Sequence, residues 1–158
     1  LSKGQMHITV KEELDISRSY LEIMQIRYIN KFDYTISCPE SLEGCQCIKL
    51  LLQPVIENSI YHGIKELPGH GYISVRIEEK GDSVCFSVED NGKGLSASDY
   101  DRLWTEHSGH FGIKNIHQRI QLYYGSRYGL TIHNREKGGC ITVITIPKRK
   151  GEVQCQQD

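Results

Sequence analysis

The chain has 158 residues, of which 38% are hydrophobic and 25% are charged, and its formal net charge is −1. This composition is typical of one ordinary globular domain and excludes a largely disordered chain. The near-neutral charge argues against nucleic acid as a partner, because such binding needs a clustered excess of Lys and Arg. No apolar run approaches the length of a membrane span and no charged-then-apolar leader is visible, so we expect any membrane anchor to lie upstream.

A helix is predicted over residues 10–28. Its apolar residues follow a heptad-like spacing, with Val10, Leu14, Leu21, Met24 and Tyr28 on one side and Ser17 in the gap. Two interpretations stay open. The stripe belongs either to a dimerisation or signalling helix, or to an amphipathic helix that packs on its own domain.

The rest of the chain predicts a strand, a helix, two strands, a long loop, a helix and two more strands. Residues 32–36 alternate as a strand does, residues 38–47 form a loop by composition, and residues 48–63 predict a helix that ends at Gly63, with Pro54 in or near its first turn. Two strands follow, at 72–79 and 83–89. Residues 90–111 are polar and glycine-rich without a clear period, which indicates a long functional or mobile loop. A helix over 112–125, two strands at 129–134 and 140–147, and a frayed tail complete the chain. This order predicts an α+β sandwich.

Three short motifs can carry chemistry. In the first, "ENSIYHG", Asn58 and His62 would share a helix face, and the Asn58 carbonyl oxygen is a suitable Mg²⁺ ligand. The alternative is a polar stripe on an exposed helix.

The second motif, "VEDNGKGL", ends a strand at Asp90. A carboxylate at this point can accept a hydrogen bond from the exocyclic amine of adenine, and Gly92 would let the backbone approach the base. The alternative is a simple hairpin turn, because Asn-Gly is a turn signal.

The third motif, "SGHFGIKN", leads through Gly109 and Gly112 into a helix, with Lys114 in its first turn. The N-terminus of a helix favours a bound anion such as a phosphate. The alternative is a flexible linker with an ordinary helix cap.

In this order, the three motifs resemble the N box and the glycine boxes of the Bergerat ATP-binding fold. Within that superfamily the chain looks most like the catalytic domain of LytS/YesM-type sensor histidine kinases. The resemblance implies a two-layer α/β sandwich, with a mixed, mainly antiparallel sheet, helices on one face and a long ATP lid. It also implies the end of a dimerisation helix at 1–30, the catalytic domain at 31–148 and a disordered tail at 149–158.

The resemblance also assigns roles to individual residues. Glu57, Asn58 and His62 would be catalytic, with Asn58 as the Mg²⁺ ligand, Glu57 polarising the attacking group and His62 near the phosphates. Asp90 would read the adenine amine. The remaining ATP-binding positions would be Gly92, Gly94, Leu95, Gly109, Phe111, Gly112, Ile113, Lys114 and Thr142. Lys93 and Arg119 would either neutralise phosphate or be surface charges, and Leu103 and Trp104 would form either a hydrophobic latch or a loop anchor.

The implied activity is transfer of the γ-phosphate of Mg-ATP to a histidine on the dimerisation helix, for relay to a response regulator. The sensor would be a homodimer, with this part as the cytoplasmic domain of a membrane-anchored bacterial protein. Two features depart from the family pattern. The second glycine box reads Gly109-His110-Phe111-Gly112, and no histidine here has the context of the phosphoacceptor.

Two other functions remain as alternatives. A nucleotide-driven ATPase clamp of the same fold would place a Glu one turn before the metal-binding Asn, where this chain has Pro54. A non-catalytic nucleotide-binding or anti-sigma-like module would have lost the residues for metal or adenine, whereas Asn58 and Asp90 are both present.

Overall fold

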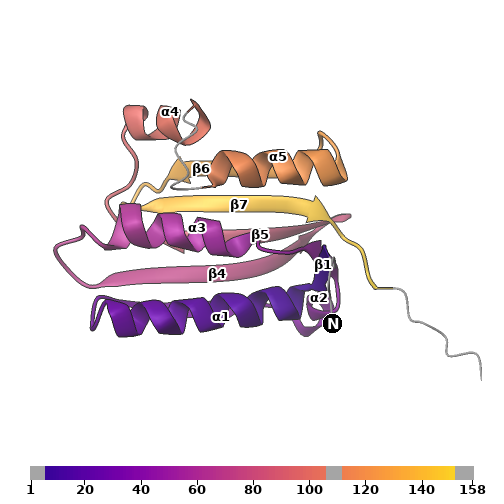
Figure 1. The fold of residues 1–158 in the computed structure, drawn as a ribbon, viewed down its shortest axis with the longest axis horizontal. Coiled ribbons are helices and arrows are strands. Elements are labelled where there is room, and N and C mark those ends of the chain that lie inside the picture. The colour runs from indigo at the N-terminus through magenta and orange to yellow at the C-terminus, as the bar shows by residue number, and fades with distance from the viewer. Residues whose placement is uncertain (1–5, 106–111, 152–158) are drawn as a thin grey trace, which may run out of the picture.

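The computed structural model describes residues 6–105 and 112–151, and its centre is a five-stranded sheet (Figure 1). In spatial order the strands are β2 (Phe32–Ser37), β4 (Gly71–Lys80), β5 (Ser83–Asp90), β7 (Cys140–Pro147) and β6 (Gly129–Asn134). β2 pairs with β4 in parallel, and the other three pairings are antiparallel. The predicted mixed, mainly antiparallel sheet is therefore confirmed.

Alternation along the strands gives the sheet one buried face. Val75 lies opposite Val88, and Val88 lies opposite Thr142, so all three side chains point to the same side. That side is buried, whereas the intervening residues of β4, such as Tyr72 and Arg76, are exposed. Asp90, the last residue of β5, also faces the buried side, so the core positions the predicted adenine-reading carboxylate.

Three helices cover this buried face: α1 (Val10–Arg27), α3 (Leu52–Asn58) and α5 (Ile113–Tyr124) (Figure 1). A capping box between Thr9 and Glu12 starts α1. The predicted heptad-like stripe of α1 is buried against α3 and β2, so the packed interpretation describes this stripe. The exposed large hydrophobic side chains of α1 and the turn after it are Ile16, Ile23, Ile26 and Ile29.

The segment between β2 and α3 is more ordered than the sequence predicted. It contains a short helix, α2 (Glu40–Glu43), and a strand, β3 (Gln46–Ile48), which pairs antiparallel with β1 (His7–Thr9). The prediction of a helix from residue 48 was therefore wrong. Ile48 is held in this pairing, and Leu50 has a φ of 59°, which an α-helix does not allow. α3 begins at Leu52, with Pro54 in its first turn as predicted.

The predicted helix does not end as an α-helix either. After Asn58 the chain continues as a π-helix, η1 (Ser59–Ile64), in which backbone bonds run from i to i+5. Gly63 lies inside η1 rather than closing the helix. The predicted face shared by Asn58 and His62 assumed α-helical spacing, which the wider π-helical turn of η1 changes.

A further helix, α4 (Ala97–Thr105), lies within the segment that the sequence predicted as a loop without a period. Ser96 and Asp99 start it by reciprocal capping, since the Ser96 hydroxyl accepts from the Asp99 amide and the Asp99 carboxylate accepts from the Ser96 amide, both at 3.1 Å. This Ser-x-x-Asp pattern was visible in the sequence and was missed. Leu103 is the buried residue of α4.

The end of the described chain is paired. The Gln46 amide donates to the carbonyl oxygen of Arg149 at 2.7 Å, and Lys150 forms a bridge with Cys45. Residues 152–158 of the predicted tail lie outside the described part. Within that part the five cysteines are free thiols, and no helix is long and apolar enough to cross a bilayer.

Candidate functional site

A small cavity of about 10 Å³ lies where β5 ends beside η1. Its lining residues are Asn58, His62, Gly63, Asp90, Gly94, Leu95 and Cys140. The structure thus brings together five of the predicted site residues, from the N-box helix, the end of β5 and the turn after it. Among the described residues, this cavity has room for about one water molecule.

Asp90 is held from three directions. Its Oδ1 atom accepts hydrogen bonds from the Gly92 amide at 2.9 Å and the Cys140 amide at 3.3 Å, and its side chain also bonds with Ser59. The residue is only 2% exposed, and this burial raises the pKa of the carboxyl above its ordinary 3.8, against the lowering effect of these bonds. A carboxylate this constrained can recognise a donor such as an amine at a defined position.

Glycines allow the backbone segments around Asp90 to touch. A Cβ atom at Gly92 would lie 2.3 Å from Cα of Gly63, so the turn after β5 rests directly on η1. A Cβ atom at Gly139, whose φ is 86°, would lie 1.9 Å from the carbonyl oxygen of Asp90. The predicted role of Gly92 beside adenine stays a prediction, and the contact seen here is with Gly63.

Asn58 is 3% exposed and lines the same cavity. Its Oδ1 atom has no hydrogen-bond partner among the residues that the structure describes. A buried polar atom without a partner is costly, and a bound cation would satisfy this one. Residues 6–105 and 112–151 contain no group of three or more His, Cys, Asp or Glu that could hold a metal. The single Asn58 oxygen is compatible with Mg²⁺, which takes few protein ligands together with water and phosphate oxygens.

Glu57 and His62 lie differently around this centre. Glu57 is half-buried on α3, does not line the cavity, and accepts a hydrogen bond from the Gln53 side chain at 3.3 Å. His62 lines the cavity from η1. The structure therefore places an acidic side chain outside the cavity, next in sequence to the residue with the unpartnered oxygen.

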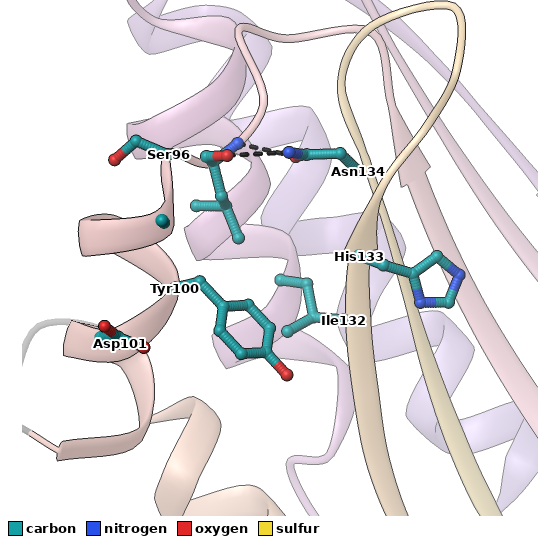
Figure 2. Close-up of a pocket in the computed structure, with 8 residues that line it drawn as sticks. Ser96, Tyr100, Asp101, Ile132, His133 and Asn134 are labelled. Carbon is teal, nitrogen blue, oxygen red and sulfur yellow. Dashed lines mark hydrogen bonds between the residues drawn. The ribbon is translucent and has the colours of Figure 1, made fainter.

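The turn after Asp90 is fastened to the end of β6. The Leu95 amide donates to Asn134 Oδ1 and the Asn134 amide group donates to the Leu95 carbonyl oxygen, each at 2.8 Å (Figure 2). Beyond this pair, α4 and β6 enclose a second cavity of about 380 Å³. Its lining includes Ile132 and Tyr100, and Figure 2 shows the His133 ring directed away from α4. The base of the predicted lid is therefore tied to the sheet.

α4 packs onto α5 through aromatic side chains. The Trp104 ring meets the His117 ring edge-on, with 5.3 Å between centroids, and Trp104 and the buried Leu103 both join the hydrophobic core. Leu103 and Trp104 therefore contact the domain, as both the latch and the loop-anchor interpretations require.

The end of the predicted lid returns to α3. Gly112 has a left-handed φ of 51° and would place a Cβ atom 3.3 Å from Pro54. Ile113 is buried and Lys114 half-buried at the start of α5, and neither lines the small cavity. Gly109 and Phe111 lie outside the described residues. Thr142 is buried on the helix-facing side of β7, opposite Val88 and Ile132, and does not line the cavity.

Sequence reasoning missed several residues of the site. Gly63 and Cys140 line the cavity, Ser59 bonds with Asp90, and Arg135 donates to the Asp90 carbonyl oxygen at 2.9 Å. Ser59 and Gly63 stood inside the quoted N-box motif, so the signal existed. The contact of Arg135 depends on how the β6–β7 turn folds back, which no local pattern reveals.

Lys93 and Arg119, the two side chains considered for phosphate neutralisation, both contact other residues of the protein. Lys93 forms an exposed ion pair with Glu66 at 2.8 Å. Arg119 donates to the carbonyl oxygens of Lys49 and Leu50 at 2.7 and 3.3 Å. These contacts favour a structural role for Arg119 over phosphate neutralisation.

Comparison of the sequence with known proteins finds a matching family and several relatives. A family model described as "Histidine kinase-, DNA gyrase B-, and HSP90-like ATPase" matches residues 47–150. The sensor histidine kinase YesM of Bacillus subtilis (strain 168) is 34% identical over 143 residues, which cover 90% of this chain and 24% of YesM. The sensor histidine kinase YpdA of Escherichia coli (strain K12) is 31% identical over 156 residues, which cover 98% of this chain and 27% of YpdA. The chain thus spans about a quarter of the length of these relatives.

Solved structures agree on the fold. The nucleotide-free catalytic domain of histidine kinase ThkA superposes with a TM-score of 0.70 at 17% identity, covering 90% of this chain and 95% of that one. ThkA in complex with the response regulator protein TrrA superposes with a TM-score of 0.65, covering 90% of this chain and 41% of that one. With the matched family model and the YesM and YpdA identities, the chain belongs to the family of histidine kinase-, DNA gyrase B- and HSP90-like ATPases.

Proposed function

We propose that this chain is the catalytic domain of a sensor histidine kinase, which binds Mg-ATP and transfers the γ-phosphate to a histidine on a dimerisation helix. The observation that carries the proposal is the convergence of Asp90 and Asn58 on one cavity. One offers a carboxylate suited to the adenine amine, and the other offers a buried oxygen suited to a cation. The similarity to YesM and YpdA, both sensor histidine kinases, supports the same reading.

The protein's part in the reaction is to bind and orient, as in phosphoryl transfer generally. The Asp90 carboxylate accepts from the adenine amine, and its bonds to Gly92 and Cys140 keep it in place. Asn58 would hold Mg²⁺ through its unpartnered oxygen. When bound, the metal neutralises charge on the phosphate oxygens. Glu57, outside the cavity, would polarise the incoming histidine, and His62 would approach the phosphates.

The predicted lid begins at the cavity that Asp90 and Asn58 line. Leu95 and Gly94 form both the wall of the cavity and the start of the lid, and the Asn134 pair holds this start in place. We therefore propose that the lid opens by rearrangement beyond Leu95, around α4. Gly109, Phe111, Gly112, Ile113 and Lys114 would then wrap the triphosphate, with Thr142 near the adenine side.

Phosphoryl transfer is favoured over ATP hydrolysis by one residue. Pro54, one turn before Asn58, carries no group able to activate water, and it lies against Gly112 in the first turn of α3. A nucleotide-driven clamp therefore lacks its catalytic base at this position. A non-catalytic module is disfavoured because both Asn58 and Asp90 retain suitable groups.

The wider context is also part of the proposal. The phosphoacceptor histidine would lie on a dimerisation helix elsewhere in a homodimeric, membrane-anchored sensor, and the phosphate would pass to a response regulator. ThkA, which shares this fold, forms a complex with the response regulator protein TrrA.

Titration with a non-hydrolysable ATP analogue, with and without Mg²⁺, tests the proposal. Trp104 is the only tryptophan and lies in α4, so its fluorescence reports a change in the lid. We expect Asp90→Asn to weaken analogue binding in both conditions by about tenfold or more, because a hydrogen bond to a charged group is lost. We expect Asn58→Ala to remove the gain in affinity that Mg²⁺ provides. Folded wild-type protein that does not bind the analogue at millimolar concentration would contradict the proposal.

A further inference from the structure

Glu13 of α1 is a buried carboxylate that the proposed chemistry does not use. The residue is 1% exposed and accepts three backbone hydrogen bonds. Its Oε1 atom accepts from the amides of Leu51 at 2.8 Å and Leu52 at 3.1 Å, and its Oε2 atom accepts from the Leu50 amide at 3.1 Å. These amides lead into α3, so one side chain of α1 caps the start of the helix that carries Asn58.

Arg119 of α5 holds the same turn through its carbonyl groups. Its Nη2 atom donates to the Lys49 carbonyl oxygen at 2.7 Å and its Nη1 atom donates to that of Leu50 at 3.3 Å. Leu50 has a left-handed φ of 59°, which non-glycine residues adopt only when their surroundings enforce it. The turn at 49–52 is therefore held through its amides by α1 and through its carbonyls by α5.

This turn determines where α3 starts, and α3 is short. It has seven residues, a length of about 10 Å, and Asn58 is its last residue. The hydrogen-bonded turns of α3 connect Leu52 to Asn58 and continue into η1, so a shift at Leu52 is carried along the helix to Asn58. Asp90 belongs to β5 and is held mainly by the sheet and by the Cys140 amide, with the bond to Ser59 as its own link to the helix that carries Asn58.

We infer that Glu13 and Arg119 are positioning residues, which set the place of Asn58 relative to Asp90 and so couple α1 and α5 to the metal side of the site. The inference rests on the proposed Mg-ATP function. It makes α1 an input to that site, since a displacement of α1 acts on Asn58 through Glu13. It also separates two parts of binding: adenine recognition at Asp90, which the sheet holds, should depend on Glu13 much less than the contribution of Mg²⁺ does.

The test compares Glu13→Gln with Glu12→Gln. The first replaces Oε2 by an amide group that faces the Leu50 amide as a second donor, and the second changes an exposed neighbour on the same helix. Calorimetric titration of each protein uses adenosine without metal, and a non-hydrolysable ATP analogue with and without Mg²⁺. For Glu13→Gln we expect adenosine affinity within about twofold of wild type and an about tenfold smaller Mg²⁺-dependent gain, the size typical when a partner behind a metal ligand is lost. Arg119→Gln should reproduce this pattern, and Glu12→Gln should match wild type.

An NMR measurement on the ligand-free protein tests the positioning role of Glu13 separately from the proposed function. In the ligand-free protein, Glu13→Gln should shift the NMR signals of the Asn58 side-chain amide and leave those of the Gly92 backbone amide in place. Glu13→Asp, which keeps the charge but shortens the side chain, serves if Gln does not fold. Unchanged Asn58 signals together with a full Mg²⁺-dependent gain in folded variants would overturn the inference. Equal losses for adenosine and analogue would also overturn it, because they indicate a merely structural role. Wild-type protein that binds neither ligand would overturn the proposed function, while the NMR comparison still decides whether Glu13 positions Asn58.

Discussion

Asp90 illustrates how a single side chain is prepared for a ligand. Its Oδ1 atom is occupied by two backbone amides, and burial opposes the ionised form that those amides stabilise. The result is a carboxyl whose direction is set and whose pKa lies above its ordinary value. A site that reads an amine needs both properties, a defined direction and an available acceptor oxygen.

The affinity for adenosine should therefore depend on pH. Protonation of Asp90 converts an acceptor oxygen into a donor, so affinity should fall as the pH falls through the folded-state pKa, which lies above 3.8. Calorimetric titration across this range checks the prediction. Asp90→Asn should bind about tenfold more weakly at neutral pH and should lose this pH dependence, apart from the titration of adenosine itself. Parallel profiles for the two proteins would contradict it.

The adjacent glycines Gly138 and Gly139 provide a matched test of close packing. Both have positive φ, of 96° and 86°, but only Gly139 has an atom within reach, the Asp90 carbonyl oxygen. We expect Gly138→Ala to lower the free energy of unfolding by about 1 kcal/mol through backbone strain alone. We expect Gly139→Ala to lower it by about 3 kcal/mol or more, because overpacking is added. Urea denaturation measures both, and equal losses would show that the contact is unimportant.

Among the elements, the strands were the most predictable. Alternation of apolar residues located β4 and β5 to within a residue or two, because each strand buries one face and the period of two is local. The position of Asp90 at the end of β5 was predictable for the same reason. α4 carried a capping signal that was overlooked, whereas β1 and β3 are only three residues each and depend on a partner far away in the sequence.

The start of the predicted lid gives a test at the level of one element. The Asn134 side chain accepts a hydrogen bond from the Leu95 amide and donates one to the Leu95 carbonyl oxygen, as a neighbouring strand would. Asn134→Ala removes both bonds, so hydrogen exchange of the Leu95 amide should accelerate by about fivefold, as expected from the loss of roughly 1 kcal/mol. Global stability should change little, because the side chain lies at the surface. His133→Ala, whose ring points away from α4, should leave this exchange rate as in wild type (Figure 2). Unchanged exchange in Asn134→Ala would show that the lid is held elsewhere.

At the scale of the whole molecule, α1 is part of the domain. Its apolar stripe contributes to the same core as the sheet, and Glu13 reaches the turn before α3. The sequence predicted the helix and its stripe, because heptad-like spacing is local. It did not predict the partner of that stripe, since a stripe of so few heptads fits a second chain and the same domain equally well. Nor did the sequence single out Glu13, because a glutamate in the first turn of a helix is common and is usually exposed.

Glu13 should make the stability of the whole fold depend on pH. Burial raises its pKa above 4.5, against the lowering effects of the three amides and of Arg119, while the nearby Cys47 thiol stays neutral because its own pKa is raised. The carboxyl is then protonated more readily in the folded state than in the unfolded state. Its contribution to stability is complete below 4.5 and is lost as the pH rises through the folded-state pKa.

Urea denaturation over a pH series measures this contribution. The free energy of unfolding of wild type, relative to Glu13→Gln, should decrease as the pH rises from 4.5. Glu12→Gln, which alters an exposed carboxylate, should not show this decrease. A relative stability of wild type that rises over the same range would show that the hydrogen bonds outweigh burial.

The π-helical run of η1 has a consequence for how this region tolerates changes in length. A helix with bonds from i to i+5 accommodates one residue more than an α-helix of the same span. Deleting a residue from an α-helix rotates everything after it by about 100°, whereas a deletion within Ser59–Ile64 can be absorbed by restoring i to i+4 bonds. The chain beyond η1 would keep its direction, and only the side chains within the run, His62 among them, would be re-aimed. A shortened η1 would have to re-form the contacts of Ser59 with Asp90 and of Gly63 with Gly92, so a change of length here remodels the site before it alters the rest of the sheet.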